Sequence, residues 1–179
     1  MTTLVPAGPD FVALFTQFEH TAFRLEIRDR YNSPSETNRF ALHRAGDPAW
    51  LDLDRVERAD WFELMRTATG AGKRVERVRV VTEPHTDYIR FEADMTPGNL
   101  EAGEDIRYLP RTHPVVAGLP SWDYWLFDSR LVARLVFDDD DRLQGAELLD
   151  DPGRVVEHCV WRDVAWHYAI PYREYFKDM

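Results

Sequence analysis

The side chains best suited to chemistry in this sequence are arginines and carboxylates near the ends of its predicted strands. A planar guanidinium group can donate two parallel hydrogen bonds to a carboxylate or a phosphate, so arginines here could hold a small anionic ligand. Neighbouring carboxyl groups could transfer protons in an enzyme acting on such a metabolite. The candidate ligand-binding residues are Arg79, Asp87, Glu104, Arg107, Arg111, Asp123 and Asp128, of which Asp87, Glu104 and Asp123 are candidate acids or bases.

The same side chains also have a structural interpretation, which we favour. Ion pairs such as Asp128 with Arg79, or Glu104 with Arg107, would hold neighbouring strand ends together. Asp123 and Asp128 lie five positions apart on one predicted strand, and odd spacing places two side chains on opposite faces of a sheet. They are therefore not expected to act as a carboxylate pair. The functional alternative is an anion held jointly by the three candidate arginines.

The histidines and the cysteine indicate neither a metal site nor a nucleophile. Two of the six histidines, His158 and His167, share a predicted helix but lie nine positions apart, out of phase around its axis. Cys159 falls on the apolar face of that helix, where a thiol is expected to be buried and unreactive. The GAGK string at 70–73 follows a helix and precedes a strand, the reverse of a phosphate-binding loop. We expect no metal and no cofactor.

Length and charge limit the class of protein. A chain of 179 residues is long enough for one domain with its own core. Its 32 acidic and 22 basic residues give a formal charge of −10, which disfavours nucleic acid as a partner. We expect a cytoplasmic protein, because the N-terminus lacks a signal-peptide pattern and no apolar run approaches the roughly 20 residues that span a membrane. The arginines that could still form a nucleic-acid surface are Arg74, Arg77, Arg79 and Arg90.

A mixture of helices and strands must position these residues. Residues 1–9 are expected to form a flexible arm, and residues 10–179 a single α/β or α+β domain with a mixed sheet flanked by helices. The valines of 74–84 suit a strand that is buried on both faces at its far end, as in a parallel sheet. Helices are expected at 10–20, twice within 32–73, once or twice within 85–106 and at 152–168; strands are expected at 21–31, 74–84, 106–111, 122–128, 130–138 and 146–149.

Two aromatic segments stand out among these elements. Residues 122–138 consist of two apolar arms joined by a polar junction, which predicts a β-hairpin in the middle of the sheet. The four aspartates at 138–141 are interpreted as a solvated turn, because the spacing of a calcium loop is missing. The segment 161–175 predicts either packing against the hairpin or a surface for a protein partner or a second copy of the chain.

Five strings in the sequence resemble an uncharacterised actinobacterial family, domain of unknown function 6879. The resemblance covers residues 11–175, and the family carries no established activity. Its members are encoded near helix-turn-helix regulators, which implies a regulatory or partner role by association. The strings are FEHTAFRLEIRDRY, RVRVVTEPHTDYIRFE, AGEDIRYLPR, WDYWLFDSRLVARLVFDDD and WRDVAWHYAIPYREY.

The order of elements is also similar to one half of the phospholipase D fold. Enzymes of that superfamily carry on their active strand a His nucleophile, a Lys two positions later and an Asp five positions after the Lys. With Asp128 placed on that Asp, the Lys position holds Asp123 and the His position holds Ser121. An acid in place of the cation would repel a phosphate, so phosphodiester hydrolysis by that mechanism is not expected.

The sequence therefore favours a non-catalytic binding or regulatory module of unknown ligand, and the family resemblance implies an association with a helix-turn-helix regulator. A protein partner or a homodimer would use the C-terminal aromatic segment. The alternative is an enzyme acting on a small metabolite that bears a phosphate or a carboxylate. Convergence of the candidate side chains on one concave pocket, as opposed to isolated pairs along the sheet, would separate these hypotheses.

Overall fold

Alternating apolar and charged residues build the centre of the β-sheet. The computed structural model describes residues 3–177. In it, β2 (Thr21–Glu26), β3 (Arg74–Val81) and β4 (Asp105–Pro110) lie side by side and parallel. Parallel strands in the middle of a sheet are covered on both faces, so every charged side chain on them needs a partner inside the protein.

The tryptophan-rich segment forms the predicted hairpin. β5 (Tyr124–Phe127) pairs antiparallel with β6 (Leu131–Phe137). Asp128 and Ser129, the first two of the three residues that join the strands, have φ angles of 52° and 51°, the left-handed conformation that a tight hairpin turn needs to match the twist of its strands. Since β5 also pairs with β2, the hairpin lies inside the sheet, as predicted.

The complete sheet is mixed and has eight strands, in the order β1-β7-β6-β5-β2-β3-β4-β8. The predicted arm over residues 1–9 is corrected at β1 (Thr3–Pro6), which pairs antiparallel with β7 (Leu143–Leu149). This pairing requires a glycine at position 145, because a Cβ atom there would lie 2.3 Å from the carbonyl oxygen of Val5. At the other edge, β8 (Ile170–Pro171) pairs with β4.

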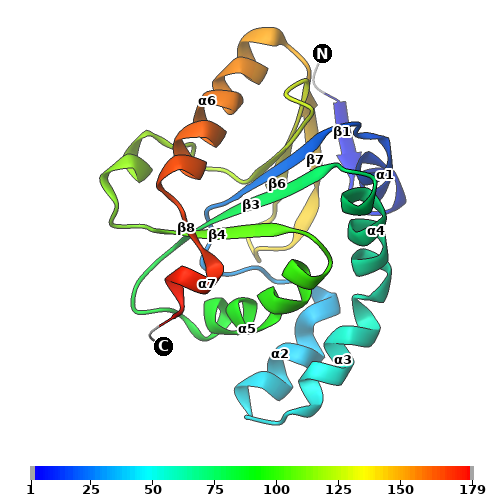
Figure 1. The fold of residues 1–179 in the computed structure, drawn as a ribbon, viewed down its shortest axis with the longest axis vertical. Helices are drawn as coiled ribbons and strands as arrows, with labels where there is room; N and C mark the ends of the chain where they lie inside the picture. The colour runs from blue at the N-terminus through cyan, green and yellow to red at the C-terminus, as the bar shows by residue number, and fades with distance from the viewer. Residues whose placement is uncertain (1–2, 178–179) are drawn as a thin grey trace.

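Helices cover both faces of the sheet. Figure 1 shows α6 (Pro152–Tyr168) on one side and α1 (Pro9–Gln17), α4 (Ala59–Gly70) and α5 (Asp87–Glu101) on the other, which we call the α6 face and the α5 face. The 3-10 helix η2 (Pro114–Gly118) joins α6 on its face. Within residues 3–177, no helix is both long and apolar enough to cross a membrane.

The segment between β2 and β3 contains more helices than predicted. The sequence predicts two, whereas the structure has one short 3-10 helix and three α-helices. The extra helix begins after Pro48, and it ends at Arg58, whose φ of −104° and ψ of 9° leave the helical range. These elements are η1 (Pro34–Glu36), α2 (Thr37–Arg44), α3 (Ala49–Glu57) and α4.

The C-terminal aromatic residues pack largely against the domain itself. The ring centroid of Trp161 lies 5.7 Å from that of Trp122, and the ring of Tyr175, in α7 (Tyr172–Tyr175), stacks 5.2 Å from that of Tyr108. Tyr168 remains 47% exposed. Internal packing therefore accounts for most of this segment, and a partner surface there stays a prediction.

Candidate functional site

Four charged side chains of the central strands lie together on the α5 face. Arg24 and Glu26 of β2 are two positions apart, as are Arg77 and Arg79 of β3, so each pair shares one face of its strand. The parallel register aligns Arg24 with Arg77 and Glu26 with Arg79. Glu26 is 3% exposed, Arg77 is 8% exposed and Arg79 is 4% exposed. The sheet therefore carries a buried cluster of charges where apolar residues would normally lie.

Glu26 is the centre of this charge cluster. Its Oε1 atom lies 2.9 Å from Nη1 of Arg77 and 3.0 Å from Nε of Arg24. Its Oε2 atom accepts a 2.7 Å hydrogen bond from Nε of Arg79. Burial by itself raises the pKa of Glu26, but the three guanidinium groups outweigh burial and lower that pKa to about 2. Glu26 is therefore ionised throughout the physiological pH range.

Glu104, just before β4, supports the far side of Arg77. Its Oε2 atom accepts a 2.9 Å hydrogen bond from Arg77, and its Oε1 atom accepts hydrogen bonds from Trp61, at 2.7 Å, and from Asn99. Both oxygens are thus occupied, which makes Glu104 a support within the protein. The predicted ion pair of Glu104 with Arg107 does not form, because Glu104 points to the α5 face and Arg107 to the α6 face.

Glu92 of α5 differs from these supports because its carboxylate has few partners. Its Oε1 atom lies 3.4 Å from Nη2 of Arg79, and the Glu92 carboxylate accepts no hydrogen bond from any other described residue. Burial raises the pKa of Glu92 to about 7; Arg79 opposes this rise, and the charge of Glu26 adds to it. Glu92 therefore exchanges its proton near neutral pH, where Glu26 does not.

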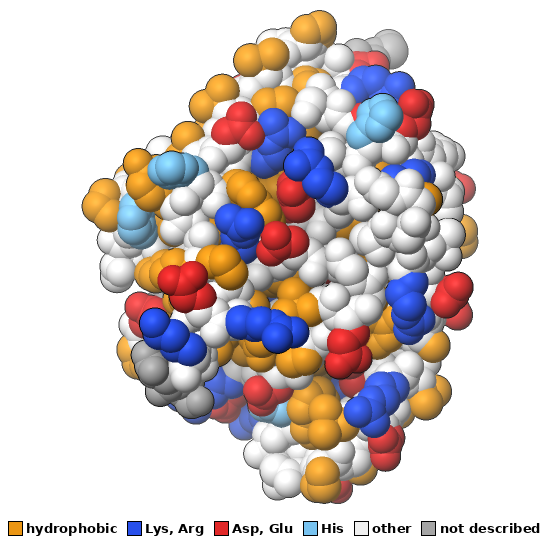
Figure 2. Space-filling model, in the orientation of Figure 1, with side chains coloured by type: hydrophobic (Ala, Val, Ile, Leu, Met, Phe, Trp, Pro, Cys, Tyr) orange, Lys and Arg blue, Asp and Glu red, His pale blue; other side chains and the backbone are white. Residues whose placement is uncertain are grey.

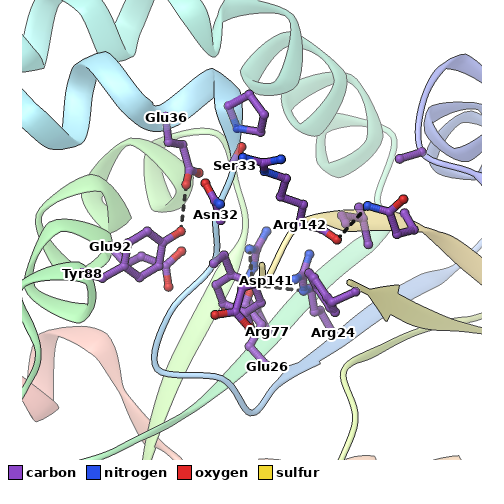
Figure 3. A pocket seen from close by; sticks show the side chains of 16 residues that line it. Arg24, Glu26, Asn32, Ser33, Glu36, Arg77, Tyr88, Glu92, Asp141 and Arg142 are labelled. Carbon is purple, nitrogen blue, oxygen red and sulfur yellow. Dashed lines mark hydrogen bonds and ion pairs between the residues drawn. The ribbon is translucent and has the colours of Figure 1, made fainter. Parts of the chain in front are cut away.

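A cavity of about 460 Å³ opens beside the charge cluster. Figure 3 shows Glu36 and Glu92 on one side of it and Arg24 on the other, with the side chain of Arg142 running from the side of Arg24 toward Ser33. The hydroxyl of Tyr88 lies on the acidic side and donates a 2.7 Å hydrogen bond to Glu36. We call these two sides the acidic wall and the basic wall.

A second cavity, of about 290 Å³, adjoins the first and is lined by several of the same side chains. The shared residues, Arg24, Glu36, Arg77 and Glu92, are all charged. The rest of the second cavity includes a large apolar and aromatic surface. Its main apolar residues are Phe11, Phe15, Trp61, Met95 and Trp125.

Two guanidinium groups of the basic wall keep donors that the protein does not use. The buried Nε atom of Arg24 lies 3.0 Å from Glu26 and its Nη2 atom 3.6 Å from Asp123, but neither of its Nη atoms donates a hydrogen bond to a described residue. Arg142, an exposed residue between β6 and β7, forms no side-chain ion pair with any of residues 3–177. Unused guanidinium donors facing a cavity can bind an anionic ligand.

Three of the seven sequence-predicted site residues belong to the charge cluster or contact it. Arg79 and Glu104 are described above. Asp123 is 1% exposed and accepts hydrogen bonds from the hydroxyl of Tyr31 and, at 3.0 Å, from the backbone N–H of Ile27. Burial raises the pKa of Asp123, against the opposing effects of Arg24 and Tyr31. Asp123 and Glu104 lie behind the cavity wall and support the residues that line it.

The three arginines predicted to hold one anion do not converge. Arg79 points to the α5 face. Arg107 points to the α6 face, because consecutive residues of a strand alternate, and its guanidinium lies 3.7 Å from the ring centroid of Trp166. Arg111 follows β4 and lies 3.1 Å from the carboxylate of Asp29. The shared anion site predicted for these three residues is therefore not formed.

Asp128 stabilises the hairpin turn and does not pair with Arg79. Its carboxylate accepts three hydrogen bonds of 2.7 to 2.9 Å from the backbone N–H groups of residues 19–21. Burial raises the pKa of Asp128, but these hydrogen bonds outweigh burial and lower it. Arg79 is too far for an ion pair, because it aligns with Glu26 at the opposite end of β2.

The arginines considered for nucleic-acid binding do not form one surface. Arg77 and Arg79 are buried in the charge cluster. Arg74 begins β3, whereas Arg90 lies on α5, 3.8 Å from Asp87. Asp87, the remaining predicted site residue, is exposed at the start of that helix, away from the cavity. On the face drawn in Figure 2, basic and acidic side chains are interspersed.

The histidines and the cysteine also lie outside the charge cluster. Among the residues that the structure describes, no three His, Cys, Asp or Glu side chains are grouped to hold a metal ion. His158 lies on the buried side of α6, where its Nδ1 atom is 2.7 Å from the carbonyl oxygen of Arg154, and burial lowers its pKa. Cys159 is half-buried.

Sequence reasoning did not select Arg24, Glu26, Glu36, Glu92 or Arg142 as site residues. The period-two pattern of β2 places the first two on the solvent side of a half-buried strand. The neighbouring strand β3 could have indicated that Arg24 and Glu26 are buried, because the valines around its own charged residues indicate burial on both faces of the sheet. Charges on an adjoining strand must then be paired inside the protein. Nothing in the local sequence marks the other three residues, which come from separate elements.

The positions that the phospholipase D template assigns to His, Lys and Asp do not form a catalytic group. Ser121 is exposed before β5. Asp123 is buried and bonded to Tyr31, and Asp128 holds backbone groups at the turn. This arrangement lacks both the nucleophile and the phosphate-binding cation of the template.

Comparison with known proteins agrees with this fold. The structure is similar to a phospholipase D family member, Nuc from Salmonella typhimurium, with a TM-score of 0.53 and 11% identity over 96% of each chain. It is also similar to NucT from Helicobacter pylori, with a TM-score of 0.57 and 7% identity over 96% of this chain and 98% of that one. These likenesses show the fold alone, and no curated protein matches the chain. A family model described as "Domain of unknown function (DUF6879)" matches residues 9–177, so the chain belongs to the DUF6879 family.

Proposed function

We propose that this protein is a non-catalytic binding module whose cavity on the α5 face holds a small molecule bearing a carboxylate or a phosphate. One observation carries the proposal: Arg24 and Arg142 line the cavity, and neither the Nη atoms of Arg24 nor the guanidinium group of Arg142 donates a hydrogen bond to a described residue. Arg77 and Arg79, by contrast, bond to carboxylates of the protein. Because Arg24 is only 15% exposed, an anion bound there would be partly desolvated and held by charge-assisted hydrogen bonds.

The non-catalytic part of the proposal rests on the phospholipase D template. Ser121 and Asp123 occupy the positions of its nucleophile and cation. The carboxylate of Asp123, at the position of the cation, would repel a phosphate. Asp128, at the third position, bonds to backbone N–H groups and does not replace the missing nucleophile or cation. Binding without turnover is the simpler use of the cavity.

Thermal unfolding with defined anions tests the proposal. The probes are inorganic phosphate, citrate, glutamate and AMP, each titrated to millimolar concentration. A ligand present at 100 times its Kd stabilises a protein by about 2.7 kcal/mol, which raises the Tm of a domain of this size by roughly 5–10 °C. Arg24→Met should abolish the shift, whereas Arg107→Met, outside the cavity, should retain it. The proposal fails if no probe raises the Tm or if Arg24→Met responds like the wild type.

An enzyme acting on a small anionic metabolite is the second candidate function. One observation favours it: two carboxyl groups of the same cavity, Glu26 and Glu92, have pKa values of about 2 and about 7. Separated pKa values are a common property of acid–base pairs in enzymes. This candidate predicts that a bound anion is consumed over hours, as followed by NMR, and that Glu92→Gln stops its consumption without preventing its binding.

The regulatory part of the proposal concerns the protein's setting in the cell. We propose a cytoplasmic protein whose ligand occupancy is sensed by a protein partner, and that this partner is a helix-turn-helix regulator. Tyr168, exposed at the end of α6, is the aromatic residue best placed for such a contact or for a homodimer. Light scattering of the wild type and of Tyr168→Ser tests the homodimer, and co-purification with a helix-turn-helix regulator tests the partner.

A further inference from the structure

We infer that the ligand of this cavity is a zwitterion whose anionic group binds Arg24 and Arg142 and whose ammonium group binds Glu36 and Glu92. This inference rests on the proposed function and narrows it to one ligand class, of which amino acids and dipeptides are the simplest members. It follows from the opposite charges of the two cavity walls (Figure 3).

The acidic wall has unused acceptors for a cation. Glu92 is only 6% exposed, yet its carboxylate has one ion pair, at 3.4 Å, and no hydrogen bond from any other described residue. Its partner Arg79 is shared, since it also lies 2.7 Å from Glu26 and donates to Tyr108 at 3.2 Å. A buried carboxylate with this little compensation is costly, and a ligand donor would lower the cost.

Glu36 provides the second acceptor of the acidic wall. Its Oε2 atom accepts the hydrogen bond from Tyr88, but its Oε1 atom lies 3.9 Å from Arg39, too far for a hydrogen bond. An ammonium group carries three N–H donors, so it could bond to both carboxylates and keep one donor for a second polar contact. A ligand with an anion alone would leave these acceptors unused.

The proton equilibrium of Glu92 supports this assignment. Burial raises the pKa of Glu92 to about 7, so about half of the empty sites are protonated at neutral pH. An ammonium group beside the carboxylate would lower that pKa, and binding would release the proton. The charged and titratable groups that face Glu92 are Arg24, Glu26, Glu36, Arg77, Arg79, Tyr88 and Tyr108.

The adjoining cavity provides space for an apolar substituent of the ligand. The two cavities have volumes of about 460 and 290 Å³ and share their charged residues. Aromatic side chains, among them Phe15, Trp61 and Trp125, line the second one. Arg39, Arg58 and Arg79 also line this cavity, but its aromatic surface suits amino acids and dipeptides with a hydrophobic side chain better than it suits phosphate or citrate.

Calorimetry with matched ligands tests the inference. The probes are L-phenylalanine, L-leucine and the dipeptides Ala-Phe and Ala-Leu, each compared with its N-acetyl form, which lacks the cation, and its C-terminal amide, which lacks the anion. We expect at least one zwitterion to bind, and both of its blocked forms to bind at least tenfold more weakly. Glu92→Gln should weaken the zwitterion at least tenfold and leave its N-acetyl form unchanged. Glu36→Gln, outside the central sheet, tests the same wall if Glu92→Gln does not fold.

Proton release gives an independent measurement. In weakly buffered solution at pH 7, a pH indicator should report protons released when a zwitterion binds to the wild type, and almost none with Glu92→Gln. If N-acetyl forms bind as tightly as the zwitterions, the inference is wrong and the proposed anion site stands. If the amides bind as tightly, or if none of these ligands or the earlier anions binds, the proposed function fails as well.

Discussion

Glu92→Gln should flatten the loss of stability at alkaline pH. The folded-state pKa of Glu92, about 7, lies above the ordinary value of 4.5 for a glutamate, so the native protein binds this proton more tightly than the unfolded chain does. The resulting stabilisation is complete below the unfolded pKa and is lost as the pH rises through the folded one. Between pH 5.5 and pH 9 the shift corresponds to a loss of about 2 kcal/mol. Glutamine has nearly the same shape and no proton to lose.

Urea unfolding followed by tryptophan fluorescence measures this effect without ligand. The expected result is that the free energy of unfolding of the wild type falls by about 2 kcal/mol more than that of Glu92→Gln between pH 5.5 and pH 9. This pH range avoids Glu26, whose lowered pKa gives stability that is lost only in acid. Glu101→Gln, exposed on the same helix, is the matched control and should behave like the wild type. Parallel curves for the wild type and Glu92→Gln would refute the reasoning.

Three further substitutions test the supports of the site. Asp128→Asn should lower the free energy of unfolding in urea by about 1 kcal/mol, because the variant loses one of three hydrogen bonds to the backbone. In the wild type, the lowered pKa of Asp128 gives stability that acid removes. The stability of Asp128→Asn should therefore fall less below pH 4 than that of the wild type. Gly103→Ala should lower the free energy of unfolding by about 1–3 kcal/mol, because φ at this position is +96° and the new Cβ atom would lie 2.3 Å from the hydroxyl of Thr69. Adding Thr69→Ala removes the clash but not the backbone strain, so it should recover only part of this loss. Arg77→Met should lower stability by about 3–5 kcal/mol, because it leaves two buried carboxylates without their shared partner, and equal stability with the wild type would contradict that role.

The hairpin and the fold class were predictable from the sequence because their signals are local. Two apolar arms around Asp128 and Ser129 determine a tight turn, and their β-branched and aromatic residues favour strands. The strand β1 was not predictable, because its four residues depend on pairing with β7, which lies more than 130 residues away. The helix α3 was missed because the break at Arg58 carries neither glycine nor proline.

The candidate site was only partly predictable for a related reason. Arg79, Glu104 and Asp123 were selected as polar residues at strand ends, and all three contact or belong to the charge cluster. The cavity walls also need Glu36 from η1, Glu92 from α5 and the loop before β7, which approach only in the folded chain. Residue type and spacing describe a single helix or strand, whereas the cavity walls consist of side chains from several helices, strands and loops.

The parallel pairing of β2 with β3 also determines the order in which the site assembles. Residues 27–73 separate the two strands, so this long segment must be closed before Glu26 can meet Arg77. The hairpin of β5 and β6 closes through residues 128–130 alone and can form within microseconds. We therefore expect the hairpin to precede the ion pairs along the folding pathway. Weakening those pairs should mainly accelerate unfolding and leave the refolding rate almost unchanged.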